Sequence, residues 1–291
     1  MYRIGIIGTE NSHAMAFSKH LNLPDPATGA FAVPDARVTM VMGPDAESAR
    51  KVMQEARVPV CAADPAEFLG QVDAMMITSR RGSVHAHYAM PFIEAGIPLF
   101  VDKPFTSDPG EAEELIAAAT RRGTPIMGGS SLKFAADTLA LRDTAREMAK
   151  KEELLSASLR YAADPDSEYD GFYFYASHLV ETALTVFGSD IQAVTASVVR
   201  GNVTALAEFP HCGVTLHFMR DSYLCEGALY SRKETVTRTI SLTGIYEREV
   251  NHFIRMLRTG EMPQPPEALA LPVRIIDAIL ASLKTGRRIA L

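Results

Sequence analysis

The chain has 291 residues, of which 47% are hydrophobic and 22% are charged, and its formal net charge is −6. Its basic residues are scattered, which argues against a nucleic-acid partner, because phosphate binding needs clustered lysines and arginines. No apolar run reaches the roughly 18 residues of a membrane span, so we expect no membrane partner.

The N-terminus and the cysteines indicate a cytoplasmic protein. The chain passes directly from Met1 into an apolar run, without the features of a signal peptide. It has three cysteines, an odd number with no metal-like spacing, and this pattern is typical of reduced thiols that pack as small hydrophobic groups. His85 and His87 are two residues apart and would point in different directions on a helix, so we expect no metal site.

Short apolar runs alternate with helical segments in the N-terminal half. Strands are predicted over residues 2–8, 38–42, 58–61, 72–78, 97–101 and 125–128. Helices are predicted from Ser12 onward and over 45–57, 84–95 and 108–122, with Ser12 and Asp45 as N-cap candidates and 24–36 as a surface loop. This alternation is typical of a doubly wound parallel sheet covered on both faces, a Rossmann-type domain. Ligands bind beyond the carboxyl ends of the strands in such a sheet.

The C-terminal half has a different pattern. Strands that are rich in β-branched residues, or that alternate in polarity, are predicted over 154–162, 191–201, 213–218, 223–230 and 235–242. Helices are predicted over 135–151, 177–187, 247–258 and 272–285. We therefore predict an α/β protein with two domains: a Rossmann domain over 1–126, and an α+β domain with a mainly antiparallel sheet over 127–291.

The first strand–helix turn reads Gly8-Thr9-Glu10-Asn11-Ser12-His13. Of the three glycines in the dinucleotide-binding pattern Gly-x-Gly-x-x-Gly, only Gly8 is present, while Glu10 and His13 stand at the other two positions. A carboxylate at the second position repels a phosphate unless it points away, but the helix N-terminus still offers N–H groups to an anion. The turn alone favours a nucleotide site and a plain tight turn equally. Asp45 is a candidate both for binding a cofactor ribose and for capping a helix, which leaves NAD and NADP open.

Asp102-Lys103-Pro104 directly follows a buried strand, at the ligand-binding edge of the predicted sheet. An ammonium group there is costly unless it has a function or a partner. Pro104 restricts the backbone of Lys103 to extended geometry, which directs the side chain across the cleft. A lysine beside a nicotinamide and a substrate hydroxyl is suited to relay a proton. The alternative is a structural ion pair with Asp102.

His178 is a second candidate for proton transfer. If Ser177 caps a helix, His178 lies in its first turn, where the helix dipole keeps the imidazole neutral and suited to act as a base. Glu181 and Thr182 share its helix face and are candidates to orient the ring. The alternative is a structural histidine. The sequence has no Gly-x-Ser-x-Gly motif, so serine-hydrolase chemistry has no basis.

Several segments together resemble the Gfo/Idh/MocA family, the relatives of glucose–fructose oxidoreductase and inositol dehydrogenase. Asp102-Lys103-Pro104 is similar to the family's Glu-Lys-Pro, and the run before it matches in spacing at His85, Ala89 and Ala95-Gly96. The segment that holds the family's catalytic histidine is matched by residues 171–178 and by Leu179, Glu181, Ala183 and Phe187-Gly188. Lys133-Phe134 and the closing Ala278, Ser282 and Gly286 also match, so the resemblance covers nearly the whole chain.

The resemblance implies NAD or NADP as cofactor, and oxidation or reduction of a sugar, polyol or related hydroxy compound. It also implies an open second sheet, through which homo-oligomers, dimers or tetramers, form. Lys103 and His178 become the proton-transfer pair, and we expect them to converge from the two domains on one crevice. The implied cofactor-binding residues are Gly8, Thr9, Glu10, Asn11, Thr78, Ser79, Arg80, His85, Asp102 and Lys103. The candidate substrate-binding residues are Lys133, Tyr161, Tyr175 and His178.

Two residues depart from the family pattern. Phe174 stands where the family commonly has aspartate, four residues before the histidine, and Arg80 replaces the usual asparagine. Two further hypotheses therefore stay open. One is a non-catalytic ligand sensor or regulatory protein on the same fold, and the other is an NAD-assisted lyase or glycosidase without net redox change.

Overall fold

The computed structural model describes residues 1–291, which form two compact units. The first unit comprises residues 1–106, 110–128 and 246–269, and the second comprises 107–109, 129–245 and 270–291. Residues 246–269 therefore return to the first unit after the second sheet has been completed, which the predicted boundary near residue 126 did not include. No helix of the chain has the length and apolar character that crossing a membrane requires.

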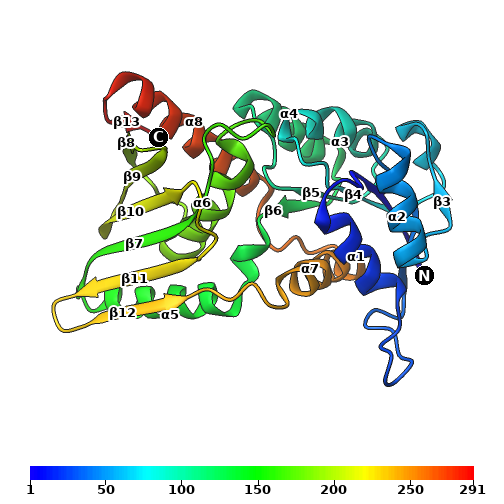
Figure 1. Ribbon diagram of the computed structural model, residues 1–291, viewed down its shortest axis with the longest axis horizontal. Helices are drawn as coiled ribbons and strands as arrows, with labels where there is room; N and C mark the ends of the chain where they lie inside the picture. The colour runs from blue at the N-terminus through cyan, green and yellow to red at the C-terminus, as the bar shows by residue number, and fades with distance from the viewer. The chain divides into compact units, whose positions relative to one another are not determined.

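The first unit is built on a six-stranded sheet with the strand order β3-β2-β1-β4-β5-β6 (Figure 1). The strands are β1 (Tyr2–Ile7), β2 (Ala36–Met42), β3 (Val60–Cys61), β4 (Ala74–Ile77), β5 (Leu99–Asp102) and β6 (Ile126–Gly129). Neighbouring strands pair in parallel, and this order is that of a doubly wound Rossmann sheet. The predicted fold class is confirmed.

Helices pack on this sheet through aromatic side chains. The main helices of the unit are α1 (Ser12–Asn22), α2 (Ala46–Ala56), α3 (His85–Glu94), α4 (Pro109–Arg122) and α7 (Ile245–Thr259). Phe100 of β5 contacts Phe17 of α1 and Phe253 of α7 edge to face, with ring centroids 5.6 and 6.3 Å apart. These three rings are fully buried, and they fix both helices beside the carboxyl end of β5, where the candidate lysine lies.

Of the three predicted N-caps, Asp45 is confirmed and Ser12 and Ser177 are not, although α1 begins at Ser12 as predicted. Asn11, not Ser12, is the N-cap of α1, because its side chain accepts the backbone N–H of His13. Asp45 caps α2 as predicted, with its carboxylate 2.7 Å from the backbone nitrogen of Ser48. The third helix, α6, begins at Tyr173 rather than after Ser177, so His178 lies beyond its first turn. The argument that the helix dipole keeps the His178 ring neutral is therefore wrong.

The second unit contains a seven-stranded mixed sheet in the order β12-β11-β7-β10-β9-β8-β13 (Figure 1). Its strands are β7 (Leu154–Ala162), β8 (Ala193–Val199), β9 (Asn202–Phe209), β10 (Cys212–Met219), β11 (Glu226–Ser231), β12 (Thr235–Thr239) and β13 (Ile289–Ala290). Only β7 and β10 pair in parallel; the other neighbours are antiparallel. The predicted mainly antiparallel character is confirmed, although β9 was missed.

Three helices, α5 (Ala136–Lys150), α6 (Tyr173–Phe187) and α8 (Leu271–Thr285), pack against the second sheet. Strand β10 shows the resulting two-sided pattern, because Val214, Leu216 and Phe218 are buried while the residues between them are half-buried. One face of the sheet therefore forms the core under the helices, and the other is the more exposed face.

Candidate functional site

The loops that follow β1, β4 and β5 meet at the carboxyl edge of the first sheet. The hydroxyl of Thr78 donates to the carbonyl of Gly8, over 3.1 Å, and the amide of Asn11 donates to Asp102, over 3.0 Å. These contacts bring together the segments that the sequence placed at one rim. Their binding roles stay predictions.

Gly8 is required by the geometry of this edge. Its φ of +111° lies in the region that favours glycine, and a Cβ there would lie 2.1 Å from the backbone nitrogen of Ser79. The chain therefore passes from β1 into α1 with its backbone pressed against the loop after β4. This is the part of the dinucleotide-binding pattern that the sequence retains.

Glu10, at the position of the second glycine, is held by the neighbouring loop. One oxygen of its carboxylate accepts the backbone N–H of Arg80 over 3.0 Å. The protein itself therefore engages one carboxylate oxygen, Oε1, while Oε2 is buried without a hydrogen-bond partner. This contact joins the loop after β1 to the loop after β4, and sequence reasoning gave no sign of it.

The end of β2 has a small residue where Rossmann domains often carry an acid. A Cβ on Gly43 would lie 1.8 Å from the hydroxyl oxygen of Thr9, so the Thr9 side chain fills this space. Thr9 in turn is 2.8 Å from the hydroxyl of Ser48. Asp45 caps α2, as described above, and of the two roles considered for it the structure shows the cap.

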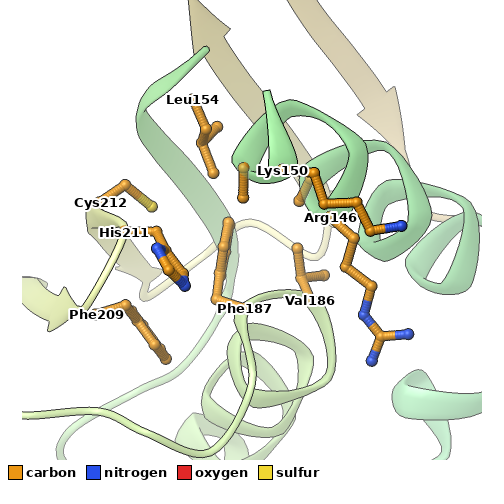
Figure 2. A pocket seen from close by; sticks show the side chains of 10 residues that line it. Arg146, Lys150, Leu154, Val186, Phe187, Phe209, His211 and Cys212 are labelled. Carbon is orange, nitrogen blue, oxygen red and sulfur yellow. The ribbon is translucent and has the colours of Figure 1, made fainter. Parts of the chain in front are cut away.

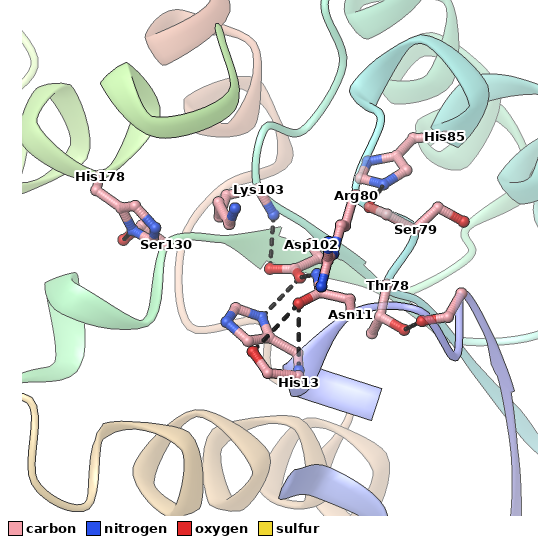
Figure 3. Close-up of polar contacts among 12 residues, drawn as sticks. Asn11, His13, Thr78, Ser79, Arg80, His85, Asp102, Lys103, Ser130 and His178 are labelled. Carbon is pink, nitrogen blue, oxygen red and sulfur yellow. Dashed lines mark hydrogen bonds and ion pairs between the residues drawn. The ribbon is translucent and has the colours of Figure 1, made fainter. Parts of the chain in front are cut away.

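Asp102, the last residue of β5, is the centre of a buried polar network (Figure 3). Its carboxylate is 2.6 Å from Nδ1 of His13 and accepts the amide of Asn11 and the backbone N–H of Lys103. Burial by itself raises the pKa of Asp102, but the His13 ring and Lys103 outweigh it and hold the pKa below its ordinary value. His13 was noted in the sequence only as a missing glycine. Its ring also packs against Tyr246 of α7, at 4.5 Å between centroids.

Lys103 is buried beside this network, with 3% of its surface exposed. The pKa of its amine is lowered from 10.5 to about 8, because burial and the charge of Arg80 together outweigh the opposite effect of Asp102 and Glu249. The Lys103–Pro104 peptide bond is cis. A lysine with this pKa exchanges a proton near neutral pH, which an ordinary exposed lysine does not.

Glu249 of α7 is a residue that the sequence analysis missed. It is 1% exposed, and its charge acts on Lys103 within the first unit. It lies among the buried Val250, Phe253 and Ile254 of an otherwise amphipathic helix. The sequence signal for Glu249 was its place on the apolar face of a predicted helix, because an acidic residue is rarely buried there without a partner.

His85 connects two of the segments at the carboxyl edge of the first sheet. Its ring is fully buried, with Nε2 2.8 Å from the carbonyl of Ser79 and Nδ1 3.3 Å from that of Phe105. Burial lowers the pKa of His85. The ring thus joins the loop after β4 to the segment that follows Pro104. This arrangement gives His85 a positioning contact, and its expected place around the cofactor stays a prediction.

The second unit contains its own polar cluster, around His178 (Figure 3). Nδ1 of His178 is 2.7 Å from the hydroxyl of Ser130, a residue just after β6. The Ser130 backbone N–H donates to Glu181, whose other oxygen is 3.0 Å from the Lys133 ammonium. Glu181 therefore reaches His178 only through Ser130, and Thr182 donates to the carbonyl of His178 rather than to its ring. Neither orients the imidazole directly, which corrects that expectation.

Aromatic rings complete the cluster around His178. Tyr161 of β7 approaches the imidazole edge to face at 5.6 Å, and Tyr175 lies 5.3 Å from it. All four candidate substrate-binding residues thus gather in one part of the second unit. Phe174, at the position of the family's aspartate, packs against Tyr169 and Tyr175 and supplies no ionisable group. Ser130 was not predicted, and its only sequence signal was its place directly after a strand.

Comparison with known proteins gives one family match. Residues 2–130 match the model of an oxidoreductase family with an NAD-binding Rossmann fold, Gfo/Idh/MocA. A search of curated proteins finds no match to the sequence.

Solved structures with the same fold include several dehydrogenases. A myo-inositol dehydrogenase from Corynebacterium glutamicum is 18% identical, with a TM-score of 0.81 over 100% of this chain and 99% of that one. The Lactobacillus casei myo-inositol dehydrogenase, in complex with NAD(H) and myo-inositol, is 13% identical, with a TM-score of 0.82 over 100% and 97%. A variant 3-ketoreductase from Actinomadura kijaniata, in complex with TDP-benzene and NADP, is 18% identical, with a TM-score of 0.76 over 97% and 98%.

At these identities the structural likeness shows the fold, and it spans both units of the chain. The family match adds the cofactor class, which confirms the expected nicotinamide dinucleotide. The match over residues 2–130 is to an oxidoreductase family with an NAD-binding Rossmann fold, Gfo/Idh/MocA, and it confirms over that part of the chain the resemblance stated from the sequence.

Proposed function

We propose that this protein is an NAD(P)-dependent dehydrogenase or reductase that acts on a sugar, a polyol or a related hydroxy compound. The observation that carries the proposal is Lys103, a buried lysine with a pKa of about 8 at the carboxyl end of β5 in an NAD-binding domain. Ligands bind at this end of the strands in a doubly wound sheet.

The first unit fits a nicotinamide dinucleotide. Gly8 brings the backbone directly from β1 into α1, whose N-terminus offers N–H groups to an anion. The Glu10 carboxylate would repel a cofactor phosphate if it pointed toward it, but one of its oxygens accepts the backbone N–H of Arg80. When bound, the cofactor supplies hydride transfer at its nicotinamide. Gly8, Thr9, Asn11 and the segment Thr78–Arg80 are the residues we propose to hold it.

Lys103 is the proposed proton-transfer group. Oxidation of an alcohol releases a proton from the hydroxyl as the hydride leaves the carbon, and the neutral amine of Lys103 accepts that proton. Reduction of the ketone uses the same amine in its protonated form. The Asp102 network fixes the backbone from which this side chain projects, through the bond from the Lys103 N–H.

His178 is the second proposed proton-transfer group. Nδ1 of His178 lies 2.7 Å from the Ser130 hydroxyl, and we propose that this contact orients the ring so that Nε2 meets a substrate hydroxyl. Lys133, Tyr161 and Tyr175 supply hydrogen-bonding groups suited to a hydroxylated compound, and we propose them as substrate-binding residues. That His178 and Lys103 act on one substrate in one crevice stays a prediction.

The more exposed face of the second sheet is the proposed oligomer interface. This face carries three threonines and two exposed larger side chains, Thr195, Thr204, Thr215, Leu206 and Tyr230. Exposed apolar side chains among short β-branched ones suit face-to-face packing of two sheets. We propose a dimer or tetramer formed through it. The three free cysteines fit a reducing compartment, which is consistent with a cytoplasmic location.

The test is a fluorescence titration of the full chain with NADH and NADPH, followed by a screen for nucleotide reduction with polyols and sugars, myo-inositol first. We expect one reduced cofactor to bind at micromolar concentration and at least one hydroxy compound to reduce NAD or NADP. Lys103→Met should bind the cofactor but transfer hydride at least about 100-fold more slowly.

Each alternative has its own outcome in this experiment. Failure of both NADH and NADPH to bind at millimolar concentration contradicts the proposal. Binding without turnover on any hydroxy compound, equal in wild type and Lys103→Met, favours the ligand sensor. A new product without accumulation of NADH favours the lyase or glycosidase.

A further inference from the structure

A separate pocket of about 370 Å³ lies in the second unit, between α5, the start of β7, the end of α6 and the turn that joins β9 to β10 (Figure 2). Its volume is within the range of small-molecule sites. None of the residues of the His178 cluster lines it. Val186 lines the pocket and lies eight residues after His178 on α6, which is about 12 Å along the helix axis.

The inner wall of the pocket is apolar and aromatic. Phe187 and Phe209 face each other with ring centroids 5.5 Å apart and tilted by 46°. Leu154 and Val186 complete the wall, and both are buried. Figure 2 shows these side chains directed toward the same space as the Cys212 sulfur. An apolar wall with two tilted rings suits a flat aromatic group more than a hydroxylated one.

The rim of the pocket is basic. Arg146 and Lys150 project from successive turns of α5, and His211 stands on the opposite side, from the β9–β10 turn. No aspartate or glutamate lines the pocket. The nearby acid Glu147 is bonded to Lys150, whereas the Arg146 guanidinium makes no hydrogen bond or ion pair within the chain. An exposed pair such as Lys150 and Glu147 is weak, so Lys150 is readily drawn to a stronger anion.

We propose that this pocket binds a small aromatic carboxylate, with its ring packed against the Phe187–Phe209 pair and its carboxylate at Arg146 and Lys150. The guanidinium matches a carboxylate in a two-bond geometry, and the second cation four residues away adds charge. This ligand differs in chemistry from the hydroxy compounds proposed for the oxidoreductase reaction. It also occupies a different place in the second unit, so the pocket is a second ligand site.

The test uses 3-phenylpropionate as the probe, titrated calorimetrically into the full chain in the presence of saturating NADH. Two matched compounds separate the contributions: 3-phenylpropan-1-ol keeps the ring and lacks the charge, and acetate keeps the charge and lacks the ring. We expect saturable one-to-one binding of 3-phenylpropionate, with the alcohol and acetate each weaker by about tenfold or more.

Variants then locate the site. The double change Arg146→Gln and Lys150→Gln should weaken 3-phenylpropionate binding by about tenfold or more, since it removes both charged partners. Ala149→Phe should abolish binding by filling the pocket. Arg142→Gln, on the same helix but outside the pocket and paired with Asp143, is the matched control and should leave the affinity within about twofold.

The proposal is overturned if 3-phenylpropionate does not bind at millimolar concentration, or if 3-phenylpropan-1-ol binds equally well. It is also overturned if the double glutamine variant binds 3-phenylpropionate with unchanged affinity. Thermal unfolding of every variant checks that it is folded. If Ala149→Phe does not fold, the double glutamine variant locates the site by itself, because Arg146 and Lys150 are exposed and their replacement removes no buried group. The hydride-transfer assay is not used here, so failure of this proposal is distinguishable from failure of the proposed enzymatic function.

Discussion

Lys103 carries an ammonium group in a place where water scarcely reaches it, and the protein surrounds it with charges of both signs. Arg80 and the surrounding burial favour the neutral amine, while Asp102 and Glu249 favour the charged one. The balance lies near pH 8, where both forms of the amine are present together. The residue is therefore suited to give and take a proton in either direction of a redox reaction.

The rate of alcohol oxidation should follow this equilibrium. Only the neutral amine accepts a proton, so we expect kcat/KM for oxidation to rise with pH through a midpoint near 8, and kcat/KM for ketone reduction to fall through the same region. The measurement is the pH profile of both directions with the hydroxy compound that the screen identifies. Lys103→Arg keeps the positive charge but cannot lose its proton near neutral pH, and should be slower by about 100-fold or more at every pH. An oxidation profile flat between pH 6 and 9 contradicts this role.

Burial of Lys103 should also cost stability in a defined pH window. The pKa of the Lys103 amine is about 8 in the folded chain and 10.5 in the unfolded chain. Between pH 8 and pH 10.5 the unfolded chain therefore binds more protons than the folded one, and the stability of the fold rises with pH. Below pH 8 the full cost is present. We expect Lys103→Met to raise the free energy of unfolding at pH 7 by about 3 kcal/mol, since the pKa is lowered from 10.5 to about 8 and one pKa unit corresponds to about 1.36 kcal/mol. The gain should vanish above about pH 10.

Chemical denaturation at pH 7 and at pH 10 measures this difference. Lys51→Met, at an exposed position of α2, is the matched control and should change stability by less than about 0.5 kcal/mol at both pH values. Equal effects of Lys103→Met at the two pH values would show that the amine is not buried in its charged form.

His13 should stabilise the fold through Asp102. His13→Phe keeps an aromatic ring beside Phe17 and Tyr246 but removes the partner that lies 2.6 Å from the buried carboxylate. We expect a loss of about 2–4 kcal/mol in the free energy of unfolding, because Asn11 and the Lys103 N–H satisfy only part of the charge. Adding Asp102→Asn to His13→Phe should recover part of the loss. A double variant less stable by the sum of both single effects would argue against a direct pair.

The sequence predicted these residues unevenly. Lys103 and Asp102 were accessible because a charged pair directly after a buried strand is costly and therefore informative. The partners of these residues were not accessible. The contacts from His13 and Glu249 to the β5 motif connect positions about 90 and 150 residues apart in the chain, and local pattern carries no information on such pairs.

The structure distinguishes the two roles considered for Asp45, capping a helix and binding a ribose. Asp45 stands near the end of β2, where an acid would bind a ribose, and its carboxylate is bonded to the Ser48 backbone at the start of α2. We expect Asp45→Ala to lower the free energy of unfolding by about 1 kcal/mol and to leave the affinity for NADH within about twofold. Fluorescence titration and thermal unfolding measure the two effects. Unchanged stability with a tenfold loss of affinity would reverse the assignment.

Elements with strong patterns were predicted well and the weak ones were not. The apolar run in β1 and the glycines that follow α3 and α4 were accessible from sequence alone. Strand β9 reads Asn-Val-Thr-Ala-Leu-Ala-Glu-Phe, in which alanines stand at two of the four buried positions. Its β signal is therefore weak, even though two neighbouring strands fix it in the sheet. The start of α6 was misplaced because Ser177 is a good cap residue in isolation, whereas the tertiary structure extends the helix back to Tyr173.

At the scale of the molecule, the exposed face of the second sheet should decide the oligomeric state. Leu206 is 45% exposed and pairs with Thr215 and Thr195 on the neighbouring strands. We expect the wild-type chain to sediment as a dimer or tetramer, and Leu206→Arg to shift it toward the monomer, because a buried unpaired charge opposes association. Val60→Arg, at an exposed position of β3 in the first unit, is the control and should leave the oligomer intact. A wild-type monomer contradicts the proposed interface.

The proposed proton transfer depends most on the pKa of the Lys103 amine. The most direct measurement is an NMR pH titration of the full chain with isotope-labelled lysine side chains, in which the Lys103→Met variant assigns the signal. We expect that signal to titrate with a midpoint near pH 8, well apart from the other lysines. A midpoint near 10.5 would contradict the account, because Lys103 would then hold its proton throughout the pH range in which the reaction runs.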